Sequence, residues 1–252
     1  MSDYDDAAEA WVDGPAAVYG RLAAAMLEHA PVPVAGAEVL DVGAGTAVAC
    51  DAAVELGARR AVATDLAEQM LRRRTASIPA VVADAACLPF GDHTFDLVMG
   101  GFCLGHLPDP AVALTEWRRV GAATVATAFA AGPSHPAKTA VDAAMERFGF
   151  VSPPWYERLK NELEPQVEDP ELLRSLAASA GFREIAVTQL TVDTGVRTAA
   201  DIVRWRIGMA HLAPFVAGLA APRRDEARRA AEEAVAGLAP VLVDIQVLSA
   251  AG

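Results

Sequence analysis

Residues 39–46 read VLDVGAGT and join an apolar strand to a glycine-rich turn that leads into a helix. Gly43 and Gly45 have no side chain, so a ligand can approach the backbone of this turn closely. Tight turns also require glycine for conformational reasons, so the pair alone leaves a nucleotide-binding turn and a purely structural turn equally open. The segments that follow help to decide between the two.

Strands and helices alternate along the chain from about residue 37. Apolar segments predict seven strands, at 38–42, 60–64, 78–83, 95–100, 122–129, 184–191 and 241–248. Helices are predicted at 47–56, 67–74, 110–120 and 170–180, the last ending before Gly181. Strands that alternate with helical crossovers are typical of a mostly parallel sheet. We therefore expect an α/β fold with a doubly wound, seven-stranded, Rossmann-like sheet.

The remaining segments are expected to form a helical cap and helical insertions on a single domain that spans residues 1–252. Residues 1–36 precede the first strand and show helical patterning around 16–29. Residues 37–131 form the sheet's core. Segments 132–168 and 198–237 are too long to be simple connections and hold several aromatic residues, which indicates added helices.

Composition excludes several classes of function. With 21 Lys and Arg against 33 Asp and Glu, the net charge of −12 argues against nucleic acid as a partner. The three cysteines form neither a metal-ligand pair nor an even disulfide set. No apolar run approaches the roughly 20 residues that cross a membrane, and the acidic N-terminus does not resemble a signal peptide. We expect a cytoplasmic protein without a metal, a nucleic acid partner or a membrane partner.

Carboxylates follow successive predicted strands. Asp65 ends the second strand, 20 residues after Gly45. An acidic residue at this place can accept hydrogen bonds from both ribose hydroxyls, and it can equally cap the helix that follows. Asp84 follows the third strand. Because the carboxyl ends of parallel strands meet at one edge of the sheet, these signals converge on a single crevice.

Two other nucleotide-binding patterns fit the sequence poorly. Nicotinamide enzymes use Gly-x-Gly-x-x-Gly, but the third glycine position falls on Val48. A Gly-x-x-x-x-Gly-Lys-Ser/Thr loop for phosphate does not occur, and the chain has only two lysines. Dinucleotide binding is therefore a weak alternative, and the pattern of a phosphate-cradling loop is missing.

Segments 39–46, 62–65, 82–85 and 95–110 together resemble class I S-adenosylmethionine-dependent methyltransferases, especially the branch that methylates ubiquinone precursors and small natural products. The resemblance covers roughly residues 37–130. It implies S-adenosylmethionine as cofactor and a small-molecule acceptor as partner. It also implies that the cofactor contacts Asp41, Gly43 and Gly45 at its methionine end, Asp65 at its ribose, Leu66, Met70, Asp84 and Ala85 around its adenine, and Gly101 and Phe102 after the fourth strand.

His106 is the candidate general base. It lies in residues 102–110, FCLGHLPDP, which resemble the family's His-Leu-Pro-Asp-Pro stretch beside the end of the fourth strand. A histidine of ordinary pKa, about 6–7, can take a proton from a phenol, alcohol or amine at neutral pH. Methyl transfer is a direct displacement in which positioning can supply most of the acceleration, so a structural histidine in this loop is the alternative.

Candidate acceptor contacts lie in the cap and the two insertions. They are Tyr19, His135, Trp155, Tyr156, Trp205, Arg206 and His211. Aromatic rings and arginine can hold an aromatic or acidic acceptor, although such residues are more often core residues of added helices. We expect O- or N-methylation of a small molecule. Methylation of a peptide or protein, and a cofactor-binding scaffold or rearrangement enzyme without net methyl transfer, stay open. The insertions also offer surface for a homodimer.

Overall fold

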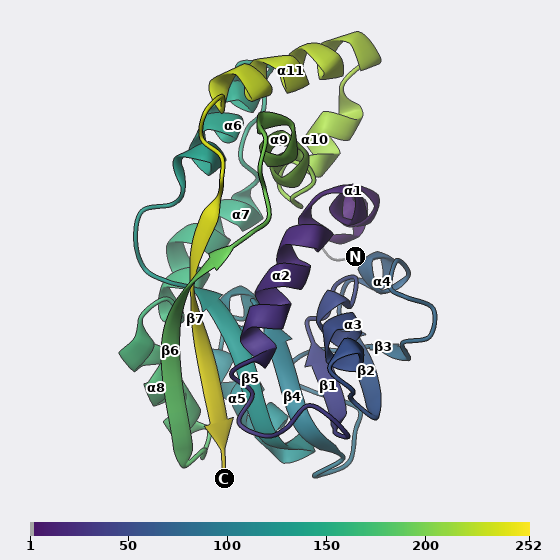
Figure 1. Ribbon diagram of the computed structural model, residues 1–252, viewed down its shortest axis with the longest axis vertical. Coiled ribbons are helices and arrows are strands. Elements are labelled where there is room, and N and C mark those ends of the chain that lie inside the picture. Colours follow the sequence, from purple (N-terminus) through teal and green to yellow (C-terminus); the bar gives the residue numbers. More distant parts are fainter. Residues whose placement is uncertain (1–2) are drawn as a thin grey trace.

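The computed structural model describes residues 3–252, and its framework is a seven-stranded sheet in the order β3-β2-β1-β4-β5-β7-β6 (Figure 1). The strands are β1 (Glu38–Val42), β2 (Arg60–Asp65), β3 (Ala80–Val82), β4 (Phe95–Gly101), β5 (Gly121–Phe129), β6 (Glu184–Asp193) and β7 (Leu242–Ala251). Strands β1 to β5 pair in parallel, whereas β7 runs antiparallel to both β5 and β6. The predicted α/β fold with a mostly parallel, seven-stranded sheet is confirmed.

Helices cover both faces of this sheet and its upper end in Figure 1. The α-helices are α1 (Ala8–Asp13), α2 (Pro15–Leu27), α3 (Val48–Glu55), α4 (Glu68–Leu71), α5 (Pro110–Val120), α6 (Pro136–Glu146), α7 (Pro154–Arg158), α8 (Pro170–Ser179), α9 (Ala199–Ile207), α10 (Ala213–Gly218) and α11 (Ala221–Ala234). Short 3₁₀ turns are η1 (Asp5–Ala7), η2 (Leu104–His106) and η4 (Glu164–Gln166), and η3 (Leu159–Leu163) is a π-helical turn. The predicted helical cap and helical insertions are confirmed.

Two hydrophobic clusters hold the layers together, one on each face of the sheet. Val39 and Leu40 are adjacent on β1 and fully buried, yet they belong to different clusters. The reason is that successive strand residues point to opposite faces. One cluster packs the sheet against α2 and α3, and the other packs it against α5 and α8. A parallel sheet covered on both faces explains why the central strand β1 is buried along nearly all of its length.

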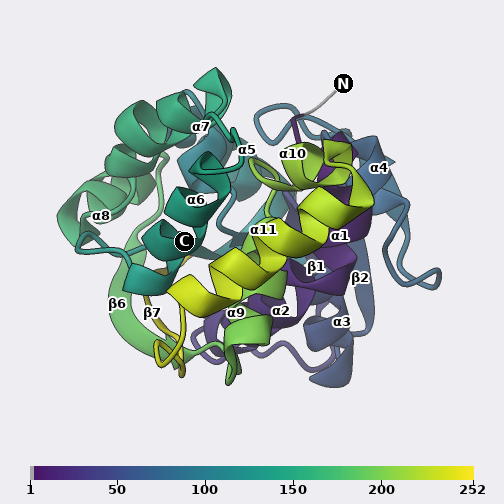
Figure 2. The same cartoon turned by 90° about the horizontal axis from the view of Figure 1, so that it is seen from above.

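The helices of the two late segments gather beyond the carboxyl ends of the parallel strands. Helix α11 packs on α6 and α9, and α9 also contacts α1 and α2 of the N-terminal cap. Figures 1 and 2 show α6, α9, α10 and α11 side by side at this end of the molecule. The late helices and the N-terminal cap therefore lie together at this end of the sheet.

Several predicted elements are shorter in the structure, and among the helices α4 loses the largest share of its predicted length. Helix α4 ends at Leu71, whereas the sequence predicts a helix over 67–74. The Arg74 side chain turns the chain at this point, because its Nε donates to the carbonyl of Ile78 at 2.5 Å and its Nη1 donates to that of Leu71 at 2.9 Å. The bond to Leu71 satisfies a carbonyl that a longer helix would have paired internally. Among the described residues, none of the helices has both the length and the apolar composition needed to cross a membrane.

Candidate active site

A cavity of about 930 Å³ lies between the carboxyl edge of the parallel strands and the late helices. Its volume falls in the range of roughly 300–1,000 Å³ that is typical of small-molecule sites. The predicted site residues that line it are Tyr19, Asp41, Gly43, Gly45, Asp65, Leu66, Met70, Gly101, Phe102, His106, Trp155, Tyr156, Trp205, Arg206 and His211. Residues that the sequence assigns to the cofactor and residues that it assigns to the acceptor thus share one cavity.

Three predicted site residues do not line this cavity. Asp84 is exposed, and its Oδ1 accepts a hydrogen bond at 2.9 Å from a backbone N–H two residues later. Ala85 is buried, and its carbonyl accepts the indole N–H of Trp117 at 3.1 Å. His135 caps helix α6, where its Nδ1 accepts the backbone N–H of Ala137 at 3.2 Å. Each residue thus has a structural contact, and ligand contacts of these three stay predictions.

The turn after β1 has a backbone that glycine alone accommodates easily. Gly43 and Gly45 adopt φ values of +70° and +55°, and Ala47 adopts +63°. A Cβ at Gly43 would lie 2.7 Å from the Sγ of Cys103, and one at Gly45 would lie 3.4 Å from the Cε of Met70. The left-handed conformation favours glycine at both positions, and the close approach of Cys103 also requires it at Gly43.

The Asp65 carboxylate ties this turn to the segment after β2. Its Oδ2 accepts the N–H of Gly45 at 2.7 Å, and its Oδ1 accepts the N–H of Ala67 at 2.8 Å. Burial raises the pKa of Asp65, and these backbone hydrogen bonds oppose the rise. Each carboxylate oxygen keeps a further lone pair, so the group can still accept bonds from a ligand. Asp65 can therefore cap the segment after β2 and still bind the ribose hydroxyls of a ligand, the two roles that the sequence leaves open.

Asp41 and Thr46 add two buried polar groups beside the same turn. Asp41 is 1% exposed, and burial raises the pKa of its carboxyl to about 7, against a weaker effect of the Cys50 thiol that donates to it at 3.6 Å. The Thr46 hydroxyl is buried and has no hydrogen-bond partner within the described part of the chain. A cationic ligand would stabilise the charged form of Asp41, and a ligand oxygen would satisfy Thr46.

Aromatic side chains form the wall next to the end of β4. Phe102 has a φ of +60°, and its N–H donates to the carbonyl of Thr127 at 3.1 Å. Its ring lies 4.5 Å from that of Phe129 and 5.4 Å from that of Tyr19, centroid to centroid. A non-glycine residue with positive φ persists only where its surroundings hold it, and such strain is often found at ligand sites.

His106 lies in η2 and faces the cavity. Burial, followed by the charge of Lys160, lowers the pKa of His106 to about 4. Its Nε2 lies 3.3 Å from the hydroxyl of Tyr4 in the N-terminal cap. The His106 side chain is packed among protein residues, but it borders the cavity. For this reason His106 is exposed to solvent although it lies inside the molecule. The expectation of an ordinary pKa of about 6–7 is wrong, because the enclosed ring is costly to charge.

A buried polar network lines the side of the cavity where the sequence predicts contacts to an acceptor. Arg206 is 3% exposed, and its Nη2 donates to both carboxylate oxygens of Asp142, at 2.8 and 2.9 Å. The same Nη2 lies 3.2 Å from the Nε2 of His211, whose ring stacks on Tyr156 at 3.8 Å with an interplanar angle of 3°. The Nε of Arg206 is buried without a hydrogen-bond partner in the described chain.

Lys138 on α6 also lines the cavity, and sequence reasoning missed it. Its Nζ lies 4.6 Å from the ring centroid of Phe129 and 5.8 Å from that of Trp205. Burial, then the charges of Arg206 and Lys160, lower the pKa of Lys138 to about 8. Lys138 belongs to no sequence motif. The only signal in the sequence was its place in a predicted helical insertion.

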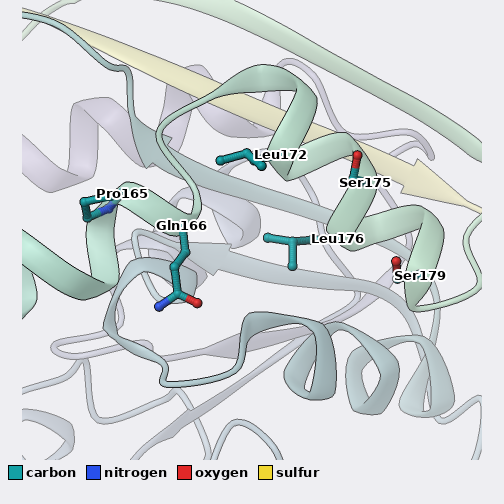
Figure 3. Close-up of a pocket in the computed structure, with 6 residues that line it drawn as sticks. All are labelled: Pro165, Gln166, Leu172, Ser175, Leu176 and Ser179. Atoms are coloured by element: carbon teal, nitrogen blue, oxygen red, sulfur yellow. The ribbon is translucent and has the colours of Figure 1, made fainter.

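A second hollow of about 450 Å³ lies on the outer side of η4 and α8 (Figure 3). Its lining residues are Pro165, Gln166, Leu172, Ser175, Leu176 and Ser179. None of these side chains titrates near neutral pH, so the hollow offers no acid, base or nucleophile of the kind found in the larger cavity. Across residues 3–252, no cluster of His, Cys, Asp and Glu could hold a metal ion.

Comparison with known proteins agrees with this geometry. Residues 40–124 match a family model described as a methyltransferase domain. A comparison with curated protein sequences found no match.

Three solved structures have a similar fold. A proposed methyltransferase of an antibiotic biosynthesis pathway from Anabaena variabilis is 13% identical, with a TM-score of 0.64 over 92% of this chain and 97% of that one. Phosphoethanolamine N-methyltransferase 2 of Haemonchus contortus, in complex with phosphomonomethylethanolamine and S-adenosylhomocysteine, is 17% identical, with a TM-score of 0.55 over 91% of this chain and 52% of that one. The [4+2]-cyclase SpnF is 17% identical, with a TM-score of 0.54 over 92% and 80%. Residues 40–124 thus match a methyltransferase domain model, and the chain has the fold of class I S-adenosylmethionine-dependent methyltransferases.

Proposed function

We propose that this protein transfers a methyl group from S-adenosylmethionine to a small-molecule acceptor inside the 930 Å³ cavity. The observation that carries the proposal is the lining of that cavity. On one side lie the glycine turn after β1 and the carboxylate of Asp65, and on the other lie aromatic and basic side chains of the late helices. A cavity of this kind can hold a cofactor and an acceptor next to each other.

The residues of the turn fit this cofactor. Gly43 and Gly45 line the cavity with bare backbone, and the Thr46 hydroxyl lacks a partner within the described residues. Asp65 can accept bonds from ribose hydroxyls, and Asp41 suits a neighbouring cation. When bound, S-adenosylmethionine supplies a methyl group on a sulfonium centre, from which an acceptor lone pair can displace it.

The chain's own residues contribute mainly by positioning. The rings of Phe102, Phe129 and Tyr19 form an apolar wall that excludes water and orients a flat acceptor. His106 is neutral at neutral pH and can accept a hydrogen bond or proton from an acceptor. With a pKa of about 4 it provides little driving force as a base. We therefore assign most of the acceleration to proximity and orientation.

Several finer statements belong to the same proposal. The similar protein from an antibiotic biosynthesis pathway supports a natural-product acceptor, and O- or N-methylation is favoured. A cytoplasmic location and a homodimer are also proposed from the sequence. The similarity to a [4+2]-cyclase supports a second function, rearrangement of a substrate without net methyl transfer.

Isotope labelling separates the two functions. The protein is incubated with S-adenosylmethionine carrying a trideuterated methyl group and with pools of phenols, carboxylic acids and amines, and the products are analysed by mass spectrometry. We expect one acceptor to gain one trideuteromethyl group for each S-adenosylhomocysteine formed. A substrate that changes its structure without S-adenosylhomocysteine formation would instead support the rearrangement. Failure of every pool, peptides included, to yield labelled product would contradict methyl transfer.

A further inference from the structure

Lys138 presents a partly buried ammonium group to the cavity without a counter-ion. Its Nζ forms no ion pair or hydrogen bond in the described chain and lies over the rings of Phe129 and Trp205 at 4.6 and 5.8 Å. An ammonium group has three N–H donors, and two cation–π contacts satisfy none of them as hydrogen bonds. A charge held partly away from water without an acceptor is costly unless a partner arrives.

Two further donors in the same wall also lack partners. Trp205 and Arg206 are each 3% exposed and line the cavity, and both the indole Nε1 and the guanidinium Nε are buried without hydrogen bonds among residues 3–252. The Cζ of Arg206 lies 5.9 Å from the Trp205 ring centroid, and the Lys138 ammonium lies at a similar distance from the same ring. Unsatisfied donors and two cations thus gather around one indole.

The neighbouring carboxylates are already engaged. Asp142 accepts the bonds from Arg206, and Glu164 pairs with Lys160. The charges that act on the Lys138 pKa are, in decreasing order, those of Arg206, Lys160, Glu164 and Asp142. The two positive charges therefore affect this pKa more strongly than the two negative charges do. This imbalance lowers the pKa of Lys138 to about 8, in addition to the larger effect of burial.

From this arrangement we infer that Lys138, Arg206 and Trp205 form an anion-binding subsite, and that the acceptor carries a carboxylate or another anionic oxygen group held there. Charge-assisted hydrogen bonds to such a group are short and strong, and the adjacent rings of Phe129 and Trp205 suit an aromatic body. The identification of the occupant as the methyl acceptor rests on the proposed function. The anion-binding subsite itself rests on the contacts of these three residues and is independent of that function.

The two lysines of the chain give a direct test, because labelling with lysine enriched in ¹³C at Cε marks only Lys138 and Lys160. The Lys160→Gln variant assigns the two NMR signals. The full chain is titrated with 4-hydroxybenzoate and with the neutral analogue 4-hydroxybenzamide. We expect the carboxylate to bind about tenfold more tightly than the amide and to raise the pKa of Lys138 by about one unit, with a smaller effect on Lys160.

Two variants distinguish charge from shape. Lys138→Met should lose most of the preference for the carboxylate, with only the part that Arg206 supplies remaining, whereas Lys138→Arg should retain the preference, since it keeps the positive charge. Thermal melting of each variant shows that it is folded. Equal affinity of the wild-type chain for the two probes, no binding of either, or a preference that is undiminished in Lys138→Met would overturn the inference.

The same samples are titrated with S-adenosylhomocysteine, which separates the two proposals. A chain that binds S-adenosylhomocysteine but shows no carboxylate preference contradicts only the anion-binding subsite. A chain that prefers the carboxylate but does not bind S-adenosylhomocysteine supports the subsite and contradicts the proposed function.

Discussion

At the scale of single residues, Asp65 joins two loops through one carboxylate, because it accepts the N–H groups of Gly45 and Ala67. We predict that Asp65→Ala weakens S-adenosylhomocysteine binding by about 1–3 kcal/mol, since ribose hydroxyls lose a charged acceptor in a partly desolvated site. Calorimetry measures the change directly.

The matched control is Asp109→Ala. Asp109 caps α5 through bonds from the N–H groups of Ala111 and Val112, and it does not line the cavity. This variant should melt at a lower temperature and keep its affinity for S-adenosylhomocysteine. Unchanged affinity in a folded Asp65→Ala protein would show that Asp65 is only a structural cap.

Asp41 makes the stability of the ligand-free protein depend on pH. The pKa of Asp41 is about 7 in the folded chain, against 3.8 for an aspartate in water, the value expected in the unfolded chain. The folded state therefore binds the proton more tightly than the unfolded state does. The contribution of Asp41 to stability therefore falls as pH rises from about 4 to about 7, and it stays constant above that. Asp41→Asn should be more stable than the wild type at pH 8 by about 2–4 kcal/mol, with the difference shrinking toward pH 4. Urea denaturation across this range measures it, and a pH-independent difference would contradict the buried carboxyl.

His106 should affect rate without setting the pH profile near neutrality. Because its pKa is about 4, it stays neutral from pH 6 to 8. We predict that His106→Ala lowers kcat/KM by about tenfold at every pH in this range, as expected for a lost positioning contact. Comparison of the two pH profiles checks this. Loss of an acidic limb near pH 6–7 in the variant would identify His106 as a base of ordinary pKa.

The sequence predicts some site residues better than others. Gly43 and Asp65 follow strands, and parallel strands bring their carboxyl ends to one edge, so local patterns suffice to bring them together. Arg206 and Asp142 are 64 residues apart on different helices, and their contact depends on how those helices pack. Lys138 carries no local motif at all.

At the scale of elements, the packing of β4 on α5 depends on one glycine. A Cβ at Gly100 would lie 2.2 Å from the Cη2 of Trp117, a residue that is fully buried. Gly100→Ala should therefore destabilise the fold by about 1–3 kcal/mol through overpacking. The matched control is Gly101→Ala, where the added methyl meets nothing within 4 Å. Urea denaturation of both variants tests the contact, and equal stability of the two would contradict this packing.

The element pattern also marks a limit of sequence reasoning. All seven predicted strands are confirmed, because alternation of apolar segments with helices is a local signal. The insertion of β7 between β5 and β6, antiparallel to both, is set by long-range pairing. No local feature of residues 242–251 predicts that neighbour order.

At the scale of the whole molecule, residues of the cap, the sheet and the late helices line the cavity together. Tyr4 of the cap meets His106 after β4, and Trp155 of α7 lies 5.9 Å from the Tyr4 ring. Cofactor and acceptor sides are thus joined through contacts between segments that are more than 100 residues apart. A ligand bound in the cavity should stabilise all three parts at once.

The central claim is that the turn after β1 and the segment after β2 hold S-adenosylmethionine in this cavity. Isothermal titration of the full chain with S-adenosylhomocysteine tests it most directly. We predict saturable binding of one ligand per chain, accompanied by a higher melting temperature. Absence of binding heat, together with an unchanged melting temperature at saturating ligand, would contradict the claim.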